Sequence, residues 1–249
     1  MSAIKTKRKK PKVSPQMSAL SRKVGMAIGD YDMLQDGDKV IVGVSGGKDS
    51  FTLLELLLYR QTFAPIHFDL MAVHVDFGIL GEKVERLKDY FEKRQIKYLI
   101  KKVDLLKGKT WEDIDCFWCS WNRRKVFFQI AQRFGFNKLA LGHHLDDIAE
   151  TILLNLFFHG NTSAMVPKQE LFNGKLTIIR PLAYIQEKET VHFIKRRKDL
   201  QYSACQCPNS DVSKRRVMKK LIKKLEKQVP CIRENIVRSI KRIKEEYLP

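Results

Sequence analysis

The chain has 249 residues, 44% of them hydrophobic, enough for one sizeable domain or a domain with a small appendage. Its formal net charge of +19, from 47 basic and 28 acidic residues, exceeds what solubility requires, and it favours a nucleic-acid partner over the charged surface typical of heat-adapted proteins. No uncharged apolar run reaches about 18 residues, and the basic N-terminus lacks the apolar core of a secretory signal, so we expect no membrane span and a reduced, cytoplasmic setting for the five cysteines.

The sequence divides into three predicted parts. Residues 1–36 contain a basic arm and a weak helical pattern, and the arm is either a phosphate-binding segment or a solubilising tail. Residues 37–185 alternate apolar strands with amphipathic helices, and we expect them to form a nucleotide-binding domain. Residues 186–249 are helical and basic and contain the late cysteines.

The alternation of elements predicts an α/β fold with a doubly wound parallel sheet, right-handed crossovers and a basic C-terminal helical extension. Predicted strands cover residues 40–44, 69–75, 97–103, 138–141 and 176–179, and predicted helices cover 51–58, 82–94, 122–134, 146–158, 187–200, 212–227 and 232–246. In the helix at 212–227, Val217, Leu221 and Leu225 form the expected apolar stripe. Its many lysines and arginines predict either a rail for an RNA backbone or a solvated face.

The segment from Ser45 to Ser50, Ser-Gly-Gly-Lys-Asp-Ser, links the first strand to the first buried helix. A strand followed by a glycine-rich turn and a helix is a geometry that binds phosphate, and Lys48 adds a positive charge to it. The alternative is an ordinary turn between strand and helix. The spacing differs from the common P-loop. It resembles the loop of the PP-loop ATP pyrophosphatase superfamily, whose members cleave ATP between the α and β phosphates and adenylate a substrate. The nucleotide-binding candidates are Ser45, Gly46, Gly47, Lys48, Asp49 and Ser50.

Further candidates follow two other strands. The backbone of Val73 and the side chain of Asp76 follow the second strand and could contact adenine and ribose, although Asp76 could also form a turn before Gly78.

Gly142-His-His-Leu-Asp-Asp147 begins a helix at the same rim of the sheet. Asp146 and Asp147 could position Mg²⁺ or nucleotide, or simply cap the helix. His143 and its neighbour His144 could contact phosphate or move protons, or could pack or cap.

Four cysteines form two close pairs, Cys116 with Cys119 and Cys205 with Cys207. Four thiolates would suit zinc, whereas three would suit an iron–sulfur cluster with one open iron position. A redox dithiol and two packed pairs are further alternatives. Cys231 has no nearby partner in the sequence, and we expect it to be packed.

The chain resembles the tRNA 2-thiocytidine synthetases, because four motifs and a late cysteine occur in the order found in that family. The motifs run from Ser45 to Ser50, from Cys116 to Arg124, from Gly142 to Asp147 and from Ile179 to Ala183. This resemblance runs from about residue 37 to about 219. It implies a [4Fe–4S] cluster on Cys116, Cys119 and Cys207. The late pair is Cys-x-Cys where the family often has Cys-x-x-Cys, which leaves Cys205 open as the third ligand, and residues 78–85 also depart from the family pattern.

The resemblance further implies that ATP and Mg²⁺ activate the C2 oxygen of a tRNA pyrimidine, with cytidine in the anticodon loop as the expected target, before sulfur replaces that oxygen. Expected partners are tRNA, a sulfur donor (sulfide or a cysteine desulfurase) and a second copy of the chain. Alternatives are a tRNA 2-thiouridine synthetase, an enzyme like lysidine synthetase, and a zinc-bearing RNA-binding module without activity. The residues expected to act in catalysis are Lys48, Asp49, Asp147, Cys116 and Cys119.

Overall fold

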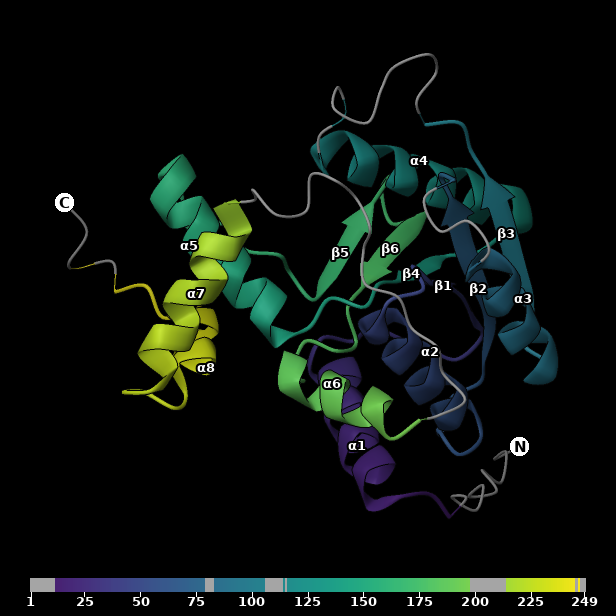
Figure 1. Ribbon diagram of the computed structural model, residues 1–249, viewed down its shortest axis with the longest axis horizontal. Helices are drawn as coiled ribbons and strands as arrows, with labels where there is room; N and C mark the ends of the chain where they lie inside the picture. The colour runs from purple at the N-terminus through teal and green to yellow at the C-terminus, as the bar shows by residue number, and fades with distance from the viewer. Residues whose placement is uncertain are drawn as a thin grey trace, which may run out of the picture.

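The computed structural model describes residues 12–78, 83–105, 114, 116–197, 214–244 and 246. Within these, six strands form one sheet in the order β3-β2-β1-β4-β6-β5 (Figure 1). All neighbouring pairs are parallel except β5 and β6, which form an antiparallel hairpin at one edge. The strands are β1 (Asp38–Gly43), β2 (Phe68–Asp76), β3 (Tyr98–Lys102), β4 (Lys138–Ala140), β5 (Lys168–Leu171) and β6 (Leu176–Ile179).

Helices cover both faces of the sheet, which confirms the doubly wound prediction. Along β1, Val40 and Val42 face one hydrophobic core, whereas Ile41 faces the other. The first core is completed by α1 (Pro15–Asp30), α2 (Lys48–Gln61), α3 (Lys83–Lys93) and α6 (Glu187–Lys195), and the second by α4 (Cys116–Phe134). The order 3-2-1-4 places the switch in crossover direction between β1 and β4, where open α/β sheets bind ligands.

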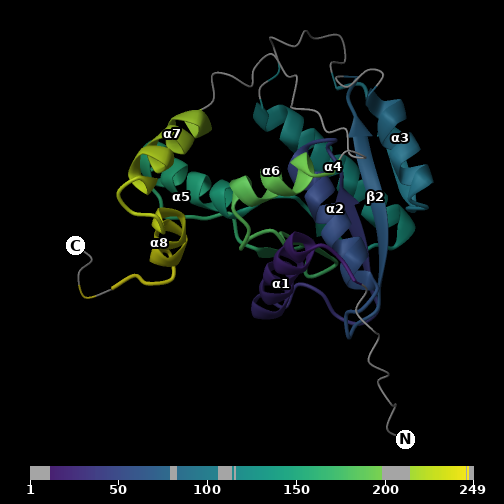
Figure 2. The ribbon, with the colours of Figure 1, turned by 60° about the horizontal axis from the view of Figure 1, so that its bottom comes forward.

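Three helices form a group beside the sheet, as Figures 1 and 2 show. They are α5 (Leu145–His159), α7 (Lys214–Glu226) and α8 (Ile232–Ser239). α5 contacts both α7 and α8, and a small apolar cluster that includes Ile148 and Ile152 of α5 packs against Ile236 of α8. The basic α7 is thereby docked on the helix that follows β4.

Local sequence signals set several helix ends. Ser14 accepts a hydrogen bond from the backbone N–H of Met17, and Pro15 occupies the first position of α1, where its missing N–H costs nothing. α5 ends at Gly160, whose φ of +62° closes the last turn in the left-handed conformation. α2 buries most of its side chains, including Leu53, Leu54 and Leu57, because it lies between the sheet and two other helices.

Several sequence expectations need correction. The helix predicted over 187–200 ends at Lys195, with Arg196 as its C-cap. α4 begins at Cys116, about six residues earlier than predicted, and α8 ends at Ser239 instead of 246. β5 was missed because it is a short, polar edge strand. The predicted stripe of α7 is wrong: Val217 is 55% exposed, and Met218 and Ile222 are the buried residues. In the described part of the chain, no helix is long and apolar enough to cross a membrane.

Candidate active site

The loop between β1 and α2, here called the phosphate loop (Ser45–Ser50), is held in shape by its serines. The Ser50 hydroxyl accepts a hydrogen bond from the backbone N–H of Ser45 at 3.2 Å and donates one to the carbonyl of Gly47 at 2.8 Å. Gly46 has a φ of +82°, a conformation that glycine adopts without strain. Because the loop ends in the first turn of α2, the positive end of that helix faces any anion bound there.

Charged side chains from three helices meet at the start of α2. The Lys48 ammonium lies 2.8 Å from Asp49 Oδ2 and 3.2 Å from Glu187 Oε1. Thr190 of α6 donates its hydroxyl to Asp49 Oδ1 at 2.5 Å. Lys219 of α7 lies 2.5 Å from Glu187 Oε2. One carboxylate, that of Glu187, therefore bridges the phosphate-loop lysine and a lysine of the basic helix.

The pKa values of Glu187 and Lys48 keep both groups charged at neutral pH. Burial alone would raise the pKa of Glu187, but hydrogen bonds and charge from Lys219 and Lys48 outweigh it and hold the pKa at about 2. Burial also opposes the charge on Lys48, yet the carboxylates of Asp49 and Glu187 raise its pKa overall. An entering phosphate would thus meet ammonium groups whose present partners are carboxylates.

The loop between β4 and α5 approaches the start of α2 closely. A Cβ atom at Gly142 would lie 3.0 Å from the carbonyl carbon of Asp49, so only glycine fits without a shift of backbone. His144 caps α5: its Nδ1 accepts the N–H of Asp147 at 3.3 Å, and Asp147 Oδ2 accepts the N–H of His144 at 3.0 Å. The capping expected as an alternative is observed for both residues, and it fixes the Asp147 carboxylate next to the phosphate loop.

The two remaining residues of this motif have different surroundings. Asp146 accepts the backbone N–H of Glu187 at 2.7 Å and pairs with Arg233 of α8, so it joins α5, α6 and α8. His143 accepts a hydrogen bond at Nδ1 from Arg180 at 3.3 Å. Burial, which outweighs a nearby carboxylate, lowers the pKa of His143 to about 4, so its imidazole is neutral at physiological pH.

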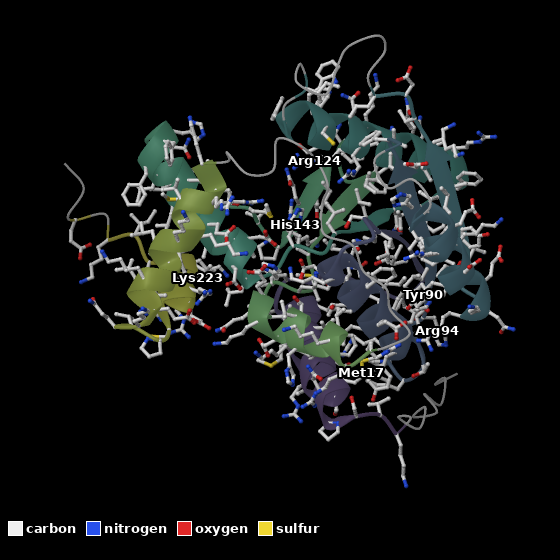
Figure 3. All side chains as sticks on the ribbon, viewed as in Figure 1. Met17, Tyr90, Arg94, Arg124, His143 and Lys223 are labelled. Carbon is white, nitrogen blue, oxygen red and sulfur yellow. The ribbon has the colours of Figure 1, made fainter. Side chains whose placement is uncertain are left out.

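A cavity of about 290 Å³ opens beside the phosphate loop. The loop contributes Ser45, Asp49 and Ser50 to its lining, the β4–α5 segment contributes Gly142, His143 and Asp147, and α4 contributes Ser120, Arg123 and Arg124. Figure 3 shows Arg124 and His143 near each other in the middle of the molecule. The start of the helix that carries Cys116 and Cys119 therefore borders the same cavity as the phosphate loop.

The cysteine pair lies in the first turn of α4. Cys119 is half-buried, next to cavity-lining Ser120, and the Arg123 guanidinium lies 3.9 Å from its sulfur. The positive end of a helix and a guanidinium both stabilise a thiolate, the ligand form for iron. No three Cys, His, Asp or Glu side chains within the described ranges share a metal position, and Cys205 and Cys207 lie outside those ranges.

Residues 17–225 match the PP-loop domain family. The chain belongs to the PP-loop family. It is 38% identical over 232 residues to a tRNA-cytidine(32) 2-sulfurtransferase of Geobacter sulfurreducens, with 90% of each chain covered. It is 39% identical over 244 residues to a protein of the same name from Pelobacter propionicus, with 94% of this chain and 89% of the relative covered.

A solved structure is also similar to this chain. It is the U34-tRNA thiolase NcsA from Methanococcus maripaludis with its [4Fe–4S] cluster, which matches with a TM-score of 0.74 and 27% identity. The match covers 94% of this chain and 80% of NcsA. The family resemblance predicted from the motifs is thereby confirmed, and this PP-loop protein lies within the tRNA sulfurtransferase group.

Not every predicted site residue lines the cavity beside the phosphate loop. Val73 is fully buried, and its carbonyl accepts the N–H of Val44 at 2.9 Å, while Val75 of the same strand lines the cavity. Asp76 accepts the N–H of Gly78 at 2.8 Å, as expected of a turn residue. Cys231 was expected to be packed, but it is exposed at the start of α8.

The sequence did not reveal several residues that lie at the phosphate loop in the structure. Glu187, Thr190 and Lys219 lie more than 130 residues beyond the phosphate loop, and no local pattern marks them as its partners. The available signal for Glu187 was its place in the first turn of a helix shortly after the Ile179–Ala183 motif. His74 was also missed: its Nδ1 lies 2.7 Å from the carbonyl of Val44 at the base of the loop.

Proposed function

We propose that this protein is an ATP-dependent tRNA thiolase, which replaces the C2 oxygen of a pyrimidine, most specifically cytidine in the anticodon loop, with sulfur. The observation that carries the proposal is the shared cavity: the phosphate loop and the first turns of the cysteine-bearing helix line one space of about 290 Å³. The similarity to tRNA-cytidine(32) 2-sulfurtransferases supports the cytidine target.

The nucleotide would bind with its phosphates over the phosphate loop. Backbone N–H groups of the loop and the positive end of α2 would receive the phosphates, and Lys48 would stabilise charge that builds up on them. Asp49 and Asp147 both line the cavity beside the phosphate loop, and they lie on opposite sides of the His144 ring, 3.8 Å from Nε2 and 3.2 Å from Nδ1. They are the proposed holders of Mg²⁺, which commonly uses one or two carboxylates together with phosphate oxygens.

The reaction needs activation because a C2 oxygen is a poor leaving group. That oxygen would attack the α-phosphate of ATP, form an O–P bond and release pyrophosphate. Sulfide would then form the C–S bond while the C–O bond breaks and the oxygen leaves with AMP. A cysteine desulfurase would supply this sulfide only together with a thiol reductant, because its persulfide must take up two electrons to release sulfide. Arg123 and Arg124 line the cavity between loop and cysteine pair, where they would stabilise the negative charge on the departing AMP.

Cys116, Cys119 and Cys207 are the proposed ligands of a [4Fe–4S] cluster. The described part of this set fits such a group, because Cys119 is half-buried beside the cavity and lies close to a guanidinium. When bound, the cluster would present sulfur to the activated base at an iron without a protein ligand.

The substrate tRNA would bind to the basic surface of the C-terminal helices. Lys220, Lys223 and Lys224 of α7 are exposed, and the chain has a net charge of +19. Figure 3 shows Lys223 on α7, across the molecule from α3. Sequence-independent phosphate contacts there would orient the RNA while the target base turns out toward the cavity.

The test is anaerobic reconstitution with iron and sulfide, followed by incubation with unmodified tRNA, ATP and Mg²⁺. We expect 2-thiocytidine by nucleoside mass spectrometry, with AMP and pyrophosphate as the nucleotide products. Cys119→Ser should abolish thiolation, while Cys231→Ser, which changes an exposed cysteine on α8, should retain it.

Each alternative predicts a different result. A colourless, zinc-loaded protein that binds tRNA without consuming ATP would indicate a binding module. Base adenylation that persists in Cys119→Ser and is completed by lysine would indicate a lysidine synthetase. Thiolation of uridine instead of cytidine would retain the chemistry but change the target.

A further inference from the structure

We infer that Lys219 of α7 is a second nucleotide-binding lysine, which contacts the β- and γ-phosphates of ATP together with Lys48. The inference rests on the proposed ATP site and extends it to the C-terminal basic helix. It also gives Glu187 a specific role, as the carboxylate that holds both ammonium groups in place until ATP arrives.

The geometry brings the two lysines to one point. Glu187 contacts Lys48 through Oε1 at 3.2 Å and Lys219 through Oε2 at 2.5 Å. Two ammonium groups on the two oxygens of a single carboxylate are close enough for one polyphosphate to contact both. Lys48 also begins α2 at the phosphate loop, so this point lies where the phosphates of a bound nucleotide would be.

Lys219 differs from its neighbours on α7. Met218 and Ile222 are buried, which fixes the rotation of the helix. One turn before Lys219, Arg215 donates to the Thr151 hydroxyl at 2.9 Å and pairs with Glu150 at 3.5 Å, which anchors the same face on α5. Lys219 is therefore held on the inner face, while the adjacent Lys220 is exposed.

The charges favour a bridge in which phosphate replaces the Glu187 carboxylate on the two lysines, over a bridge that only stabilises the fold. An ion pair that remains partly in contact with solvent contributes little to the stability of a fold, and the side chains of Lys219 and Glu187 are 37% and 22% exposed. A triphosphate carries more negative charge than Glu187 and could replace its oxygens on both lysines. Glu187 would then compete with ATP, so its removal should not weaken nucleotide binding.

The experiment measures ATP and AMP affinity by calorimetry, with Mg²⁺ present, on the wild-type protein and on three variants. Lys219→Met should weaken ATP binding about tenfold, which corresponds to about 1.4 kcal/mol, and should leave AMP binding unchanged because AMP lacks the β- and γ-phosphates. Glu187→Gln should bind ATP as tightly as wild type or more tightly.

The matched control is Lys188→Met. The Lys188 side chain is 70% exposed and pairs with Glu226 at 3.6 Å, so this change removes a different ion pair between α6 and α7 without touching Lys48. It should leave ATP and AMP affinity unchanged. Thermal unfolding of each variant confirms that the fold is intact.

Several results would overturn the inference. Wild-type ATP affinity in Lys219→Met would remove Lys219 from the nucleotide site. A parallel loss of AMP affinity, or weaker ATP binding in both Lys219→Met and Glu187→Gln, would make the bridge structural. If the wild-type protein thiolates tRNA in these cases, only this inference fails; if it binds no ATP at all, the proposed function fails with it.

Discussion

The start and the middle of α2 carry two charge clusters that differ in purpose. At its start, Lys48 is held by two half-exposed carboxylates beside the phosphate-loop cavity. Two turns later, Glu55 is 1% exposed and accepts hydrogen bonds from Tyr90 and Arg94, while Arg197 pairs with it at 2.9 Å. A second cavity, of about 660 Å³, borders this Glu55 cluster. Figure 3 shows Tyr90 and Arg94, two members of the cluster, near each other.

The difference shows how one helix supports both binding and stability. The first cluster lies at the positive end of α2, where backbone N–H groups lack partners within the helix and an anion is favoured. The second lies in the middle of the helix, where backbone N–H and C=O groups pair within the helix, so the backbone offers no site for an anion there. Glu55 instead joins α2 to α3 through Arg94 and extends to Arg197 just after α6. Substitutions at Glu55 and Lys48 separate the two roles.

Glu55→Ala should have the largest effect, a loss of about 3–5 kcal/mol in the free energy of unfolding, because it leaves buried Tyr90 and two arginines without their shared acceptor. Denaturant titration measures it. ATP affinity of the folded variant should be unchanged. Glu92→Ala, which removes an exposed partner of Tyr98, is the control and should cost less than about 1 kcal/mol. Equal losses would show that burial of Glu55 has no special importance.

Lys48→Ala should show the opposite pattern. We expect ATP-dependent thiolation to fall at least about 100-fold, equivalent to about 2.7 kcal/mol of transition-state stabilisation, with a nearly unchanged unfolding midpoint. Single-turnover kinetics at saturating tRNA give the rate, and thermal denaturation gives the midpoint. A destabilised variant that retains its rate would reverse the roles assigned to the two clusters on α2.

Glu150 on α5 is a buried carboxylate whose pairing with Arg215 offsets only part of the cost of burial. Burial, together with the charge of Asp147, raises its pKa to about 7 against the partial compensation of Arg215. The folded state therefore keeps a proton that the unfolded state loses, so this contribution to stability is complete below about pH 4.5 and is lost as pH rises to about 7. Relative to wild type, Glu150→Gln should gain about 2 kcal/mol between pH 5 and pH 8. A pH-independent difference would contradict the raised pKa.

Double replacement of Lys220 and Lys223 by alanine should have the smallest effect. Both lie on the exposed side of α7, so tRNA affinity should fall about tenfold at moderate salt, and the slope of log affinity against log salt should decrease by about 1–2. Filter binding across a salt series measures both quantities. ATP affinity without tRNA should not change, and an unchanged salt slope would place the RNA on another surface.

Much of the fold followed from local patterns. β1, the phosphate loop and α2 were predictable because an apolar strand, two glycines and an apolar helix are contiguous in the chain. β5 was hidden by its polar Lys-Gln-Glu-Leu sequence, although Asn173-Gly174 in the following turn, where both residues have positive φ, was a hairpin signal. The start of α4 was missed because Cys116 to Trp121 lacks a clear apolar period.

The site was predictable only where its residues lie within motifs. Asp147 and the phosphate loop were nominated in this way, and the structure brings them to one cavity. The Glu187 bridge was not, since its contacts to Lys48 and Lys219 join helices that only the folded chain brings together. Spacing also could not separate capping from catalysis at His144, because a residue at a helix start can serve both purposes.

The most direct measurement follows the oxygen that leaves the base. Transfer RNA whose cytidines carry a heavy oxygen isotope at C2 is incubated with the reconstituted protein, ATP, Mg²⁺ and sulfide, and the nucleotide products are analysed by mass spectrometry. The account predicts labelled AMP in an amount equal to the 2-thiocytidine formed, with pyrophosphate as the second product. Unlabelled AMP, or ADP and inorganic phosphate, would contradict activation of the C2 oxygen at the phosphate loop.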